Sequence, residues 1–178
     1  MLESFNLLIS TSRRNERNAC SELWYLLKEI GDKEPKVDAT YISGLIVASS
    51  QIDPIKVIEE FKNLIKEKPW QFRYVKKVVP IQIIIPTSIE SIKQSALNIV
   101  INMNSDKKYR ILIRKRSTNL SSSSLIDAIA PKINNKVDLA NPDIILLIEI
   151  IGEVTGISLI NPNNILSIER NKRELLNT

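Results

Sequence analysis

The hydrophobic pattern of the first half alternates between short apolar runs rich in β-branched residues and longer stretches with helical spacing. The short runs predict strands at residues 5–11, at 37–49 with a turn near 41–44 that divides the run in two, and at 72–79. The helical spacing predicts helices over residues 12–30 and 54–68, the first ended by Gly31 and the second begun by Asp53 and Pro54. The order strand-helix-strand-strand-helix-strand predicts a ferredoxin-like domain, an antiparallel sheet with both helices on one face.

The pattern changes after an apolar connector at residues 80–86, and we place a domain boundary at Pro86. Behind it, Thr87-Ser88-Ile89-Glu90 has the form of a helix capping box. The serines at 121–124 predict a second helix ending near residues 131–133, or alternatively a flexible linker. Predicted strands follow the apolar runs at 108–115, 137–139, 144–151, 154–160 and 165–169, and the charged residues 170–178 are expected to fray. The sequence thus predicts two α/β (α+β) domains, residues 1–86 and 87–178.

Composition argues against most catalytic sites. The 178 residues include no His and a single cysteine, Cys20, so imidazole catalysis, His metal sites and internal disulfides are excluded. No phosphate-binding or dinucleotide-binding glycine motif occurs, and the acidic residues are scattered singly. We therefore expect no catalytic residues, no metal and no cofactor. The lone cysteine and the lack of a secretory or membrane-spanning segment predict a cytoplasmic protein without a membrane partner.

Basic residues form the strongest local charge feature, although the net charge is only +5. Within ten residues lie six cations: Lys107, Lys108, Arg110, Arg114, Lys115 and Arg116. Strand alternation places Arg110, Arg114 and Arg116 on one face, while Tyr109, Ile111 and Ile113 point to the core. Such a row can bridge neighbouring phosphates of a nucleic acid. The alternative is an edge strand that its charges keep in solvent.

Two further basic clusters lie in the first half. Arg13, Arg14 and Arg17 stand at the start of the first predicted helix, where they could bind phosphate or pair with Glu16 or Glu22. The third cluster, Arg73, Lys76 and Lys77, is accompanied by aromatic residues at positions 70, 72 and 74. We interpret these aromatics as core or domain-contact residues rather than as platforms for base stacking.

Several of these motifs together resemble the THUMP domain: YRILIRKR at 109–116, the serines before a helix, VDLANPD at 137–143, and the aliphatic strand through Glu149. The segment STSRRNERNA at 10–19, with Glu22-Leu23 and SGLIV at 43–47, is similar to the ferredoxin-like domain that precedes THUMP in many tRNA-modifying proteins. The two resemblances cover nearly the whole chain.

The chain is similar to stand-alone THUMP proteins, whose eukaryotic members are tRNA-binding adaptors of an RNA cytidine acetyltransferase. The resemblance implies non-catalytic binding of the acceptor stem and CCA end of tRNA, with that acetyltransferase as partner in making acetylcytidine. It implies RNA contacts at Arg114, Lys115, Arg116, Ser122, Ser123 and Lys132, to which the charge pattern adds Arg110, Arg13, Arg14, Lys76 and Lys77.

Other functions stay open on the sequence alone. The chain could be a protein-interaction module without specific RNA binding, or the RNA-binding subunit of a thiolation or methylation enzyme. A small enzyme that uses Lys or a carboxylate is a third possibility. The sequence does not predict the oligomeric state.

Overall fold

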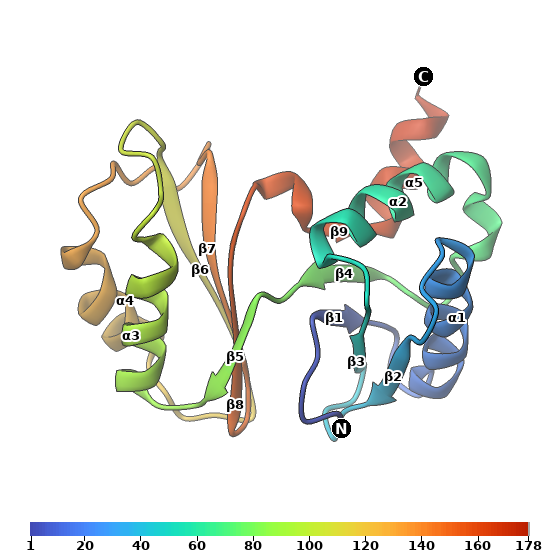
Figure 1. The fold of residues 1–178 in the computed structure, drawn as a ribbon, viewed down its shortest axis with the longest axis horizontal. Coiled ribbons are helices and arrows are strands. Elements are labelled where there is room, and N and C mark those ends of the chain that lie inside the picture. The colour runs from blue at the N-terminus through green and yellow to red at the C-terminus, as the bar shows by residue number, and fades with distance from the viewer. Residues whose placement is uncertain (178) are drawn as a thin grey trace. The chain divides into compact units, whose positions relative to one another are not determined.

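A computed structural model describes residues 1–177 of the chain, which form two compact units (Figure 1). Unit 1 comprises residues 1–81 together with the stretch from 163 onward, and unit 2 comprises residues 82–162. This division differs from the predicted boundary at residue 86 in two ways. Residues 82–86 belong to unit 2, and the C-terminal stretch returns to unit 1, because its short strand and its helix join the sheet and core of that unit.

Unit 1 is built on an antiparallel five-stranded sheet in the order β2-β3-β1-β4-β9. Its strands are β1 (Leu7–Ser10), β2 (Lys36–Ala39), β3 (Leu45–Ser49), β4 (Lys77–Pro80) and β9 (Leu166–Ser167). Its helices are α1 (Glu16–Glu29), α2 (Pro54–Glu67) and α5 (Ile168–Leu176), with a 3-10 turn η1 (Pro69–Gln71) after α2 and another, η3 (Pro162–Asn164), before β9. The first six elements follow the predicted order. The assignment to the ferredoxin-like class stays a prediction, since β9 and α5 lie outside that pattern.

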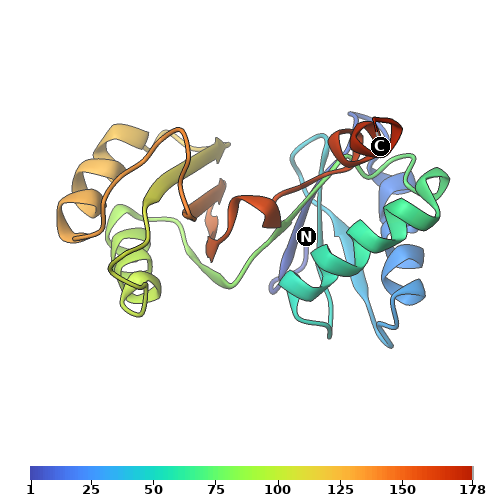
Figure 2. The ribbon, with the colours of Figure 1, turned by 90° about the horizontal axis from the view of Figure 1, so that it is seen from above.

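Helices α1 and α2 cover one face of this sheet (Figure 2). Alternate strand residues, such as Leu7 and Ile9, share one buried core with Leu23 of α1 and Phe61 of α2. Phe61 meets Phe72 edge to face, with ring centroids 5.7 Å apart. The predicted start of α2 is confirmed, because the Asp53 carboxylate accepts the N–H groups of Ile55 and Lys56 ahead of the first turn.

Three predictions for unit 1 are wrong in part. Of residues 72–79, only the last few form a strand, because the Glu22 carboxylate accepts the N–H groups of Arg73, Tyr74 and Val75 in place of a neighbouring strand. Of residues 165–169, only Leu166–Ser167 pair, and they pair with β4. The C-terminal segment predicted to fray is helix α5, which buries Ile168 and packs Leu175 against the core. Thr178 lies outside the described residues.

Unit 2 contains a mixed four-stranded sheet in the order β5-β8-β7-β6, in which only the β6 and β7 pair is parallel. Its strands are β5 (Ile83–Pro86), β6 (Tyr109–Arg116), β7 (Ile144–Ile151) and β8 (Val154–Ile160). Helices α3 (Ile89–Val100) and α4 (Ser122–Ile129) share a core with alternate residues of β7, and a 3-10 turn, η2 (Ala130–Lys132), follows α4. The predicted class, α/β with two sheets and helices on them, is confirmed.

The serines at 121–124 open a helix, as predicted, and are not a linker. Ser121 caps α4 by accepting the N–H of Ser124. In the predicted capping box the cap of α3 is Ser88 rather than Thr87, whose hydroxyl instead bonds that of Thr155. The predicted connector at 80–86 contains strand β5, which pairs with β8. The predicted strand at 137–139 is reduced to a single bridge between Val137 and Tyr109.

Strand β6 alternates as predicted, with Ile111 and Ile113 packed on the helical core and the arginines on the opposite face. The parallel register sets Arg114 beside Glu149 of β7. The Glu149 side chain is fully buried, and its carboxylate accepts Nη1 of Arg114 at 3.1 Å and Nη1 of Arg116 at 2.7 Å. A buried carboxylate is tolerated only when it is paired and hydrogen-bonded, so the two arginines serve to hold Glu149 in the sheet.

Asp138 organises the loop between η2 and β7. Its carboxylate pairs with Nζ of Lys108 at 2.8 Å and accepts the N–H groups of Ala140 and Asn141. The Lys108 bond, followed by the Asn141 bond, lowers the pKa of Asp138 from 3.8 to about 2. Among residues 1–177, no helix is long and apolar enough to cross a membrane.

We predict that replacing both arginines with Ala destabilises the fold by about 3–5 kcal/mol, because it leaves a buried carboxylate uncompensated. Adding Glu149→Leu to the Arg114→Ala, Arg116→Ala variant should recover most of this loss. Lys115→Ala is the matched control, since it removes a cation from the same strand and leaves Glu149 paired. Urea unfolding measures all four proteins. A double variant as stable as wild type would contradict the structural role of the arginines.

We also predict that Asp138 makes the free energy of unfolding fall at acidic pH. Its pKa is lower in the folded chain than the ordinary 3.8, so its charged form stabilises the fold above pH ~4, and this contribution is lost as the pH falls toward 2. NMR titration of the carboxyl carbon should give a midpoint near 2, and Asp138→Asn should flatten the dependence of unfolding on pH in this window. The control variant is Asp127→Asn, which removes an exposed carboxylate of α4 instead.

Candidate nucleic-acid interface

The cationic row of β6 is largely engaged within unit 2. Arg114 and Arg116 are each 27% exposed and share Glu149, so the three groups together carry one net positive charge. Nη1 of Arg110 donates to the backbone oxygen of Leu139 at 3.2 Å. Sequence reasoning missed the role of Glu149. The available signal was a single acidic residue within an unbroken aliphatic strand.

Lys115 points away from this row, because it lies between Arg114 and Arg116 on an alternating strand. Its side chain is exposed, and Nζ donates to the backbone oxygen of Leu120 at 2.7 Å. Leu120 belongs to the loop that leads into α4. This contact places the Lys115 ammonium beside the serines that begin that helix.

The first turns of α3 and α4 lie at the same end of the sheet as the β7–β8 turn, which is the lower end of unit 2 in Figure 1. Helix α3 follows β5, whose last residue, Pro86, pairs with Val154, and α4 follows β6, whose last residue, Arg116, pairs with Ile151. Unpaired N–H groups and the helix dipole make each of these helix starts favourable for an anion.

An open groove of about 630 Å³ lies at this end of unit 2. Its lining residues are Pro86, Thr87, Thr118, Asn119, Leu120, Gly152 and Glu153. We call it the strand-end groove. Backbone bonds hold its walls: the N–H of Thr87 donates to Glu153 at 2.8 Å, and the N–H of Gly152 donates to Arg116 at 2.9 Å. The lining includes one carboxylate, Glu153, beside the hydroxyls of Thr87 and Thr118. The two helix starts and the nearby Lys115 ammonium favour a phosphate at the part of the groove next to Leu120.

The structure brings only part of the predicted RNA site of unit 2 to this groove. Ser122 and Ser123 are the first two residues of α4, and Oγ of Ser123 bonds Oγ of Ser121 at 2.7 Å. Lys132 is exposed but lies beyond the other end of α4, roughly 12 Å of helix away. Arg110 is at the opposite end of β6 from the groove. None of the predicted residues lines the groove itself. Lys115, Ser122 and Ser123 adjoin it, since Nζ of Lys115 bonds the lining residue Leu120 and the two serines follow Leu120 closely in the chain.

In unit 1 the start of α1, where the sequence predicted a phosphate, is occupied by a carboxylate of the chain itself, Glu16. The Glu16 carboxylate accepts the N–H of Gly44 at 2.5 Å and the hydroxyl of Ser43 at 3.1 Å, and the Gly44 bond is the main cause of its lowered pKa. Arg13 and Arg14 are exposed in the turn just before the helix. The predicted alternative, pairing of these arginines with Glu16 or Glu22, does not occur within residues 1–177, because both carboxylates bond elsewhere.

The third basic cluster is partly engaged. Nζ of Lys76 lies 3.6 Å from the Glu169 carboxylate, and Lys77 begins β4, in register with Ser10 and Ser167. Of the neighbouring aromatics, Phe72 is buried and Tyr74 packs on the core, as predicted. Trp70 departs from the prediction, since it is 63% exposed on η1. The structure describes it as neither a core residue nor one buried in a contact.

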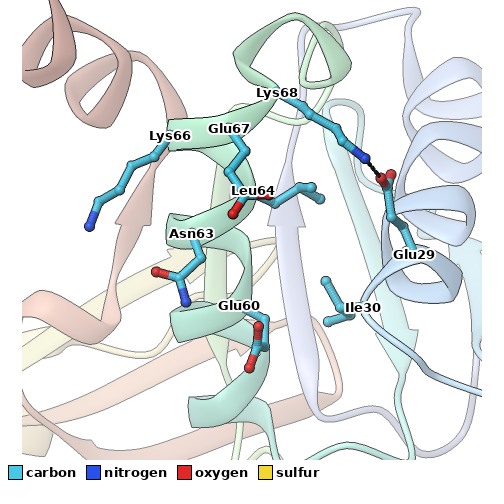
Figure 3. A pocket seen from close by; sticks show the side chains of 8 residues that line it. All are labelled: Glu29, Ile30, Glu60, Asn63, Leu64, Lys66, Glu67 and Lys68. Atoms are coloured by element: carbon cyan, nitrogen blue, oxygen red, sulfur yellow. Dashed lines mark hydrogen bonds and ion pairs between the residues drawn. The ribbon is translucent and has the colours of Figure 1, made fainter.

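A second groove, of about 490 Å³, lies in unit 1 between the end of α1 and helix α2 (Figure 3). Glu29 and Lys68 form an ion pair at 2.5 Å on its wall, and the bond to Glu29 raises the pKa of Lys68. Glu60 and Glu67 add two more carboxylates, so the groove is unfavourable for phosphate. Among residues 1–177, no group of three or more His, Cys, Asp or Glu side chains is placed to hold a metal ion.

Solved structures share this fold over most of the chain. PH1313 from Pyrococcus horikoshii Ot3 is 18% identical with a TM-score of 0.61, over 89% of this chain and 55% of its own. TrmN from Thermus thermophilus is 17% identical with a TM-score of 0.58, over 88% and 46%. A 4-thiouridine synthetase, solved with RNA and ATP, is 17% identical with a TM-score of 0.51, over 88% and 41%. The chain thus spans about half the length of these proteins.

A search of curated protein sequences found no match. The scan against family models matched one family, the THUMP domain, over residues 86–160. The matched segment begins at the last residue of β5 and ends at the last residue of β8, and so contains α3, α4 and the strand-end groove. Residues 86–160 of this chain are a THUMP domain.

Proposed function

We propose that the chain is a tRNA-binding protein that holds phosphates of tRNA at the strand-end groove and presents the tRNA to a separate modifying enzyme. The observation that carries the proposal is the meeting of two helix starts, a row of hydroxyls and Lys115 at one end of the THUMP domain. Phosphate contacts of this kind position an RNA without reading its sequence.

The comparisons support RNA binding at the level of the domain. The 4-thiouridine synthetase with a similar fold was solved in complex with RNA. The THUMP match covers the groove itself. RNA binding in tRNA modification is therefore the part of the proposal with the broadest support.

The finer part of the proposal is the partner and the reaction. The resemblance to stand-alone THUMP proteins suggests an RNA cytidine acetyltransferase, with this chain as a non-catalytic cytoplasmic adaptor and the acceptor stem and CCA end as its target. Holding tRNA near such an enzyme raises the local substrate concentration without any chemistry in this chain. The test is reconstitution: acetylcytidine in tRNA should increase when the chain is added to the acetyltransferase, and 4-thiouridine formed with a thiolation enzyme instead would overturn this assignment.

We predict that Ser122→Asp weakens tRNA binding about tenfold, since a carboxylate at the groove repels phosphate and removes a hydrogen bond to a charged group. The substitution does not threaten the fold, because an acidic residue in the first turn favours a helix. Asn134→Asp is the matched control: it adds the same charge at an exposed position beyond the other end of α4. Binding is measured by fluorescence anisotropy with tRNA, tRNA without its CCA end, and duplex DNA over a salt series.

Lys115→Gln should lower the salt slope of tRNA binding by roughly 0.7–0.9, the value of one phosphate contact. Equal effects of Ser122→Asp and Asn134→Asp would show that only net charge matters and would contradict the groove assignment. Equal affinity of the wild-type chain for tRNA and DNA would contradict tRNA recognition and favour the protein-interaction alternative. Arg114 and Arg116 are unsuitable for this test, because their loss also exposes the buried Glu149 charge.

A further inference from the structure

Helix α1 carries an outward face that the fold of unit 1 does not use. The buried residues Ala19, Leu23, Leu26 and Leu27 define its inner face. The helical periodicity of 3.6 residues puts the following side chains on the opposite side: Arg17, Ser21, Trp24, Tyr25 and Lys28. We call these five residues the α1 outer face. Trp24 is 48% exposed and Tyr25 is 55% exposed, which is unusual for two adjacent large aromatics on a helix of a folded domain.

The carboxylates of α1 are all bound elsewhere in unit 1. Glu16 bonds the β2–β3 turn through Gly44, and Glu22 bonds three N–H groups ahead of β4. Glu29 pairs with Lys68. None of the three lies on the α1 outer face, so each acidic side chain of the helix supports a tertiary contact. The negative charge is therefore directed to the flanks of the helix.

The two cations of the α1 outer face, Arg17 and Lys28, are exposed. Arg17 is exposed and has no ion pair within the described part of the chain. Nζ of Lys28 lies 5.8 Å from the centroid of the Trp24 ring and donates to the backbone oxygen of Lys33. Two more exposed arginines, Arg13 and Arg14, precede the helix. The face thus presents two aromatic rings between cations that are about 16 Å apart along the helix.

We propose that the α1 outer face binds unpaired nucleotides of RNA, with bases stacked on Trp24 and Tyr25 and phosphates bound by Arg17 and Lys28. Aromatic platforms flanked by cations bind single strands in this way, because every base offers a π-face and every linkage a charge. Exposed Trp, Tyr and Arg also occur at protein interfaces. The exclusion of carboxylates from the face favours a polyanion over a protein surface of mixed charge. The inference rests on the proposed function, since it adds a second contact to an RNA-binding chain.

The test uses fluorescence of Trp24. Trp70→Phe leaves Trp24 as the only tryptophan of the chain, and an unstructured oligouridine is titrated against this variant. We expect saturable quenching of the Trp24 emission. Trp24→Ala lacks this reporter, so its binding is measured by fluorescence anisotropy of a labelled oligouridine, and the affinity should fall about 5- to 100-fold, the range for loss of one stacked base. Tyr41→Ala, which removes an exposed aromatic from the β2–β3 turn, is the matched control and should leave the affinity unchanged.

The electrostatic part has its own control. Arg17→Gln with Lys28→Gln should lower the salt slope of oligouridine binding by about 1.4, since each phosphate contact on a single strand contributes about 0.7. Lys56→Gln with Lys66→Gln makes the same charge change at exposed positions of α2, and this control should lower the salt slope of oligouridine binding by much less.

The outcomes separate this proposal from the function proposed above. If Trp24→Ala binds oligouridine and tRNA as wild type does, while Ser122→Asp still weakens tRNA binding, the α1 proposal is overturned and the strand-end groove stands. That result would favour a protein partner for the face. If the wild-type chain binds neither RNA, both proposals fall.

Discussion

The burial of the Glu149 carboxylate constrains the whole of unit 2. A charge without solvent costs several kcal/mol unless strong partners replace the water, and two guanidinium groups from the neighbouring parallel strand supply them. Those bonds fix Arg114 and Arg116 to the face of the sheet. Arg114 and Arg116, part of the strongest basic motif of the sequence, therefore act mainly in stability. The candidate phosphate site lies at the end of the strands instead. There the positive charge comes from Lys115 and from backbone dipoles, which need no compensating carboxylate.

The same use of carboxylates organises unit 1. Glu22 takes up three backbone N–H groups that would otherwise require a partner strand, and Glu16 joins the start of α1 to a turn 28 residues away. Because both carboxylates bond backbone groups, neither pairs with the neighbouring Arg13, Arg14 or Arg17. A modest net charge of +5 can therefore coexist with local cationic surfaces, because Glu16 and Glu22 bond within unit 1 while Arg13, Arg14 and Arg17 beside them are exposed.

Local periodicity predicted most elements correctly, because it reports which face of an element is buried. The alternation of β6 and the starts of α2 and α4 follow from it directly. It failed where a distant partner decides the outcome. The sequence of β5 is that of an apolar connector, and only its pairing with β8 makes it a strand. The sequence of α5 is that of a charged tail, and only the packing of Ile168 and Leu175 in the core of unit 1 orders it.

The candidate site was predictable to the same extent and for the same reason. Lys115, Ser122 and Ser123 are close in sequence, so a local motif could identify them together. The ion pairs of Arg114 and Arg116 depend on Glu149, more than thirty positions later in the chain. Thr87 lines the groove directly after strand β5, far from Lys115 in sequence. Only the parallel register of β6 and β7 shows that a row of arginines beside a lone buried glutamate is a structural ion triad.

The two proposed surfaces differ in the part of an RNA that each would recognise. The strand-end groove offers hydroxyls, helix starts and an ammonium, which suit phosphates whether or not the bases are paired. The α1 outer face offers rings, which reach only bases that are free of a helix. A duplex alone would satisfy the first surface and a single strand alone the second. A tRNA contains both a paired acceptor stem and an unpaired CCA end, so each surface has its own target within one such molecule, even though neither surface reads sequence.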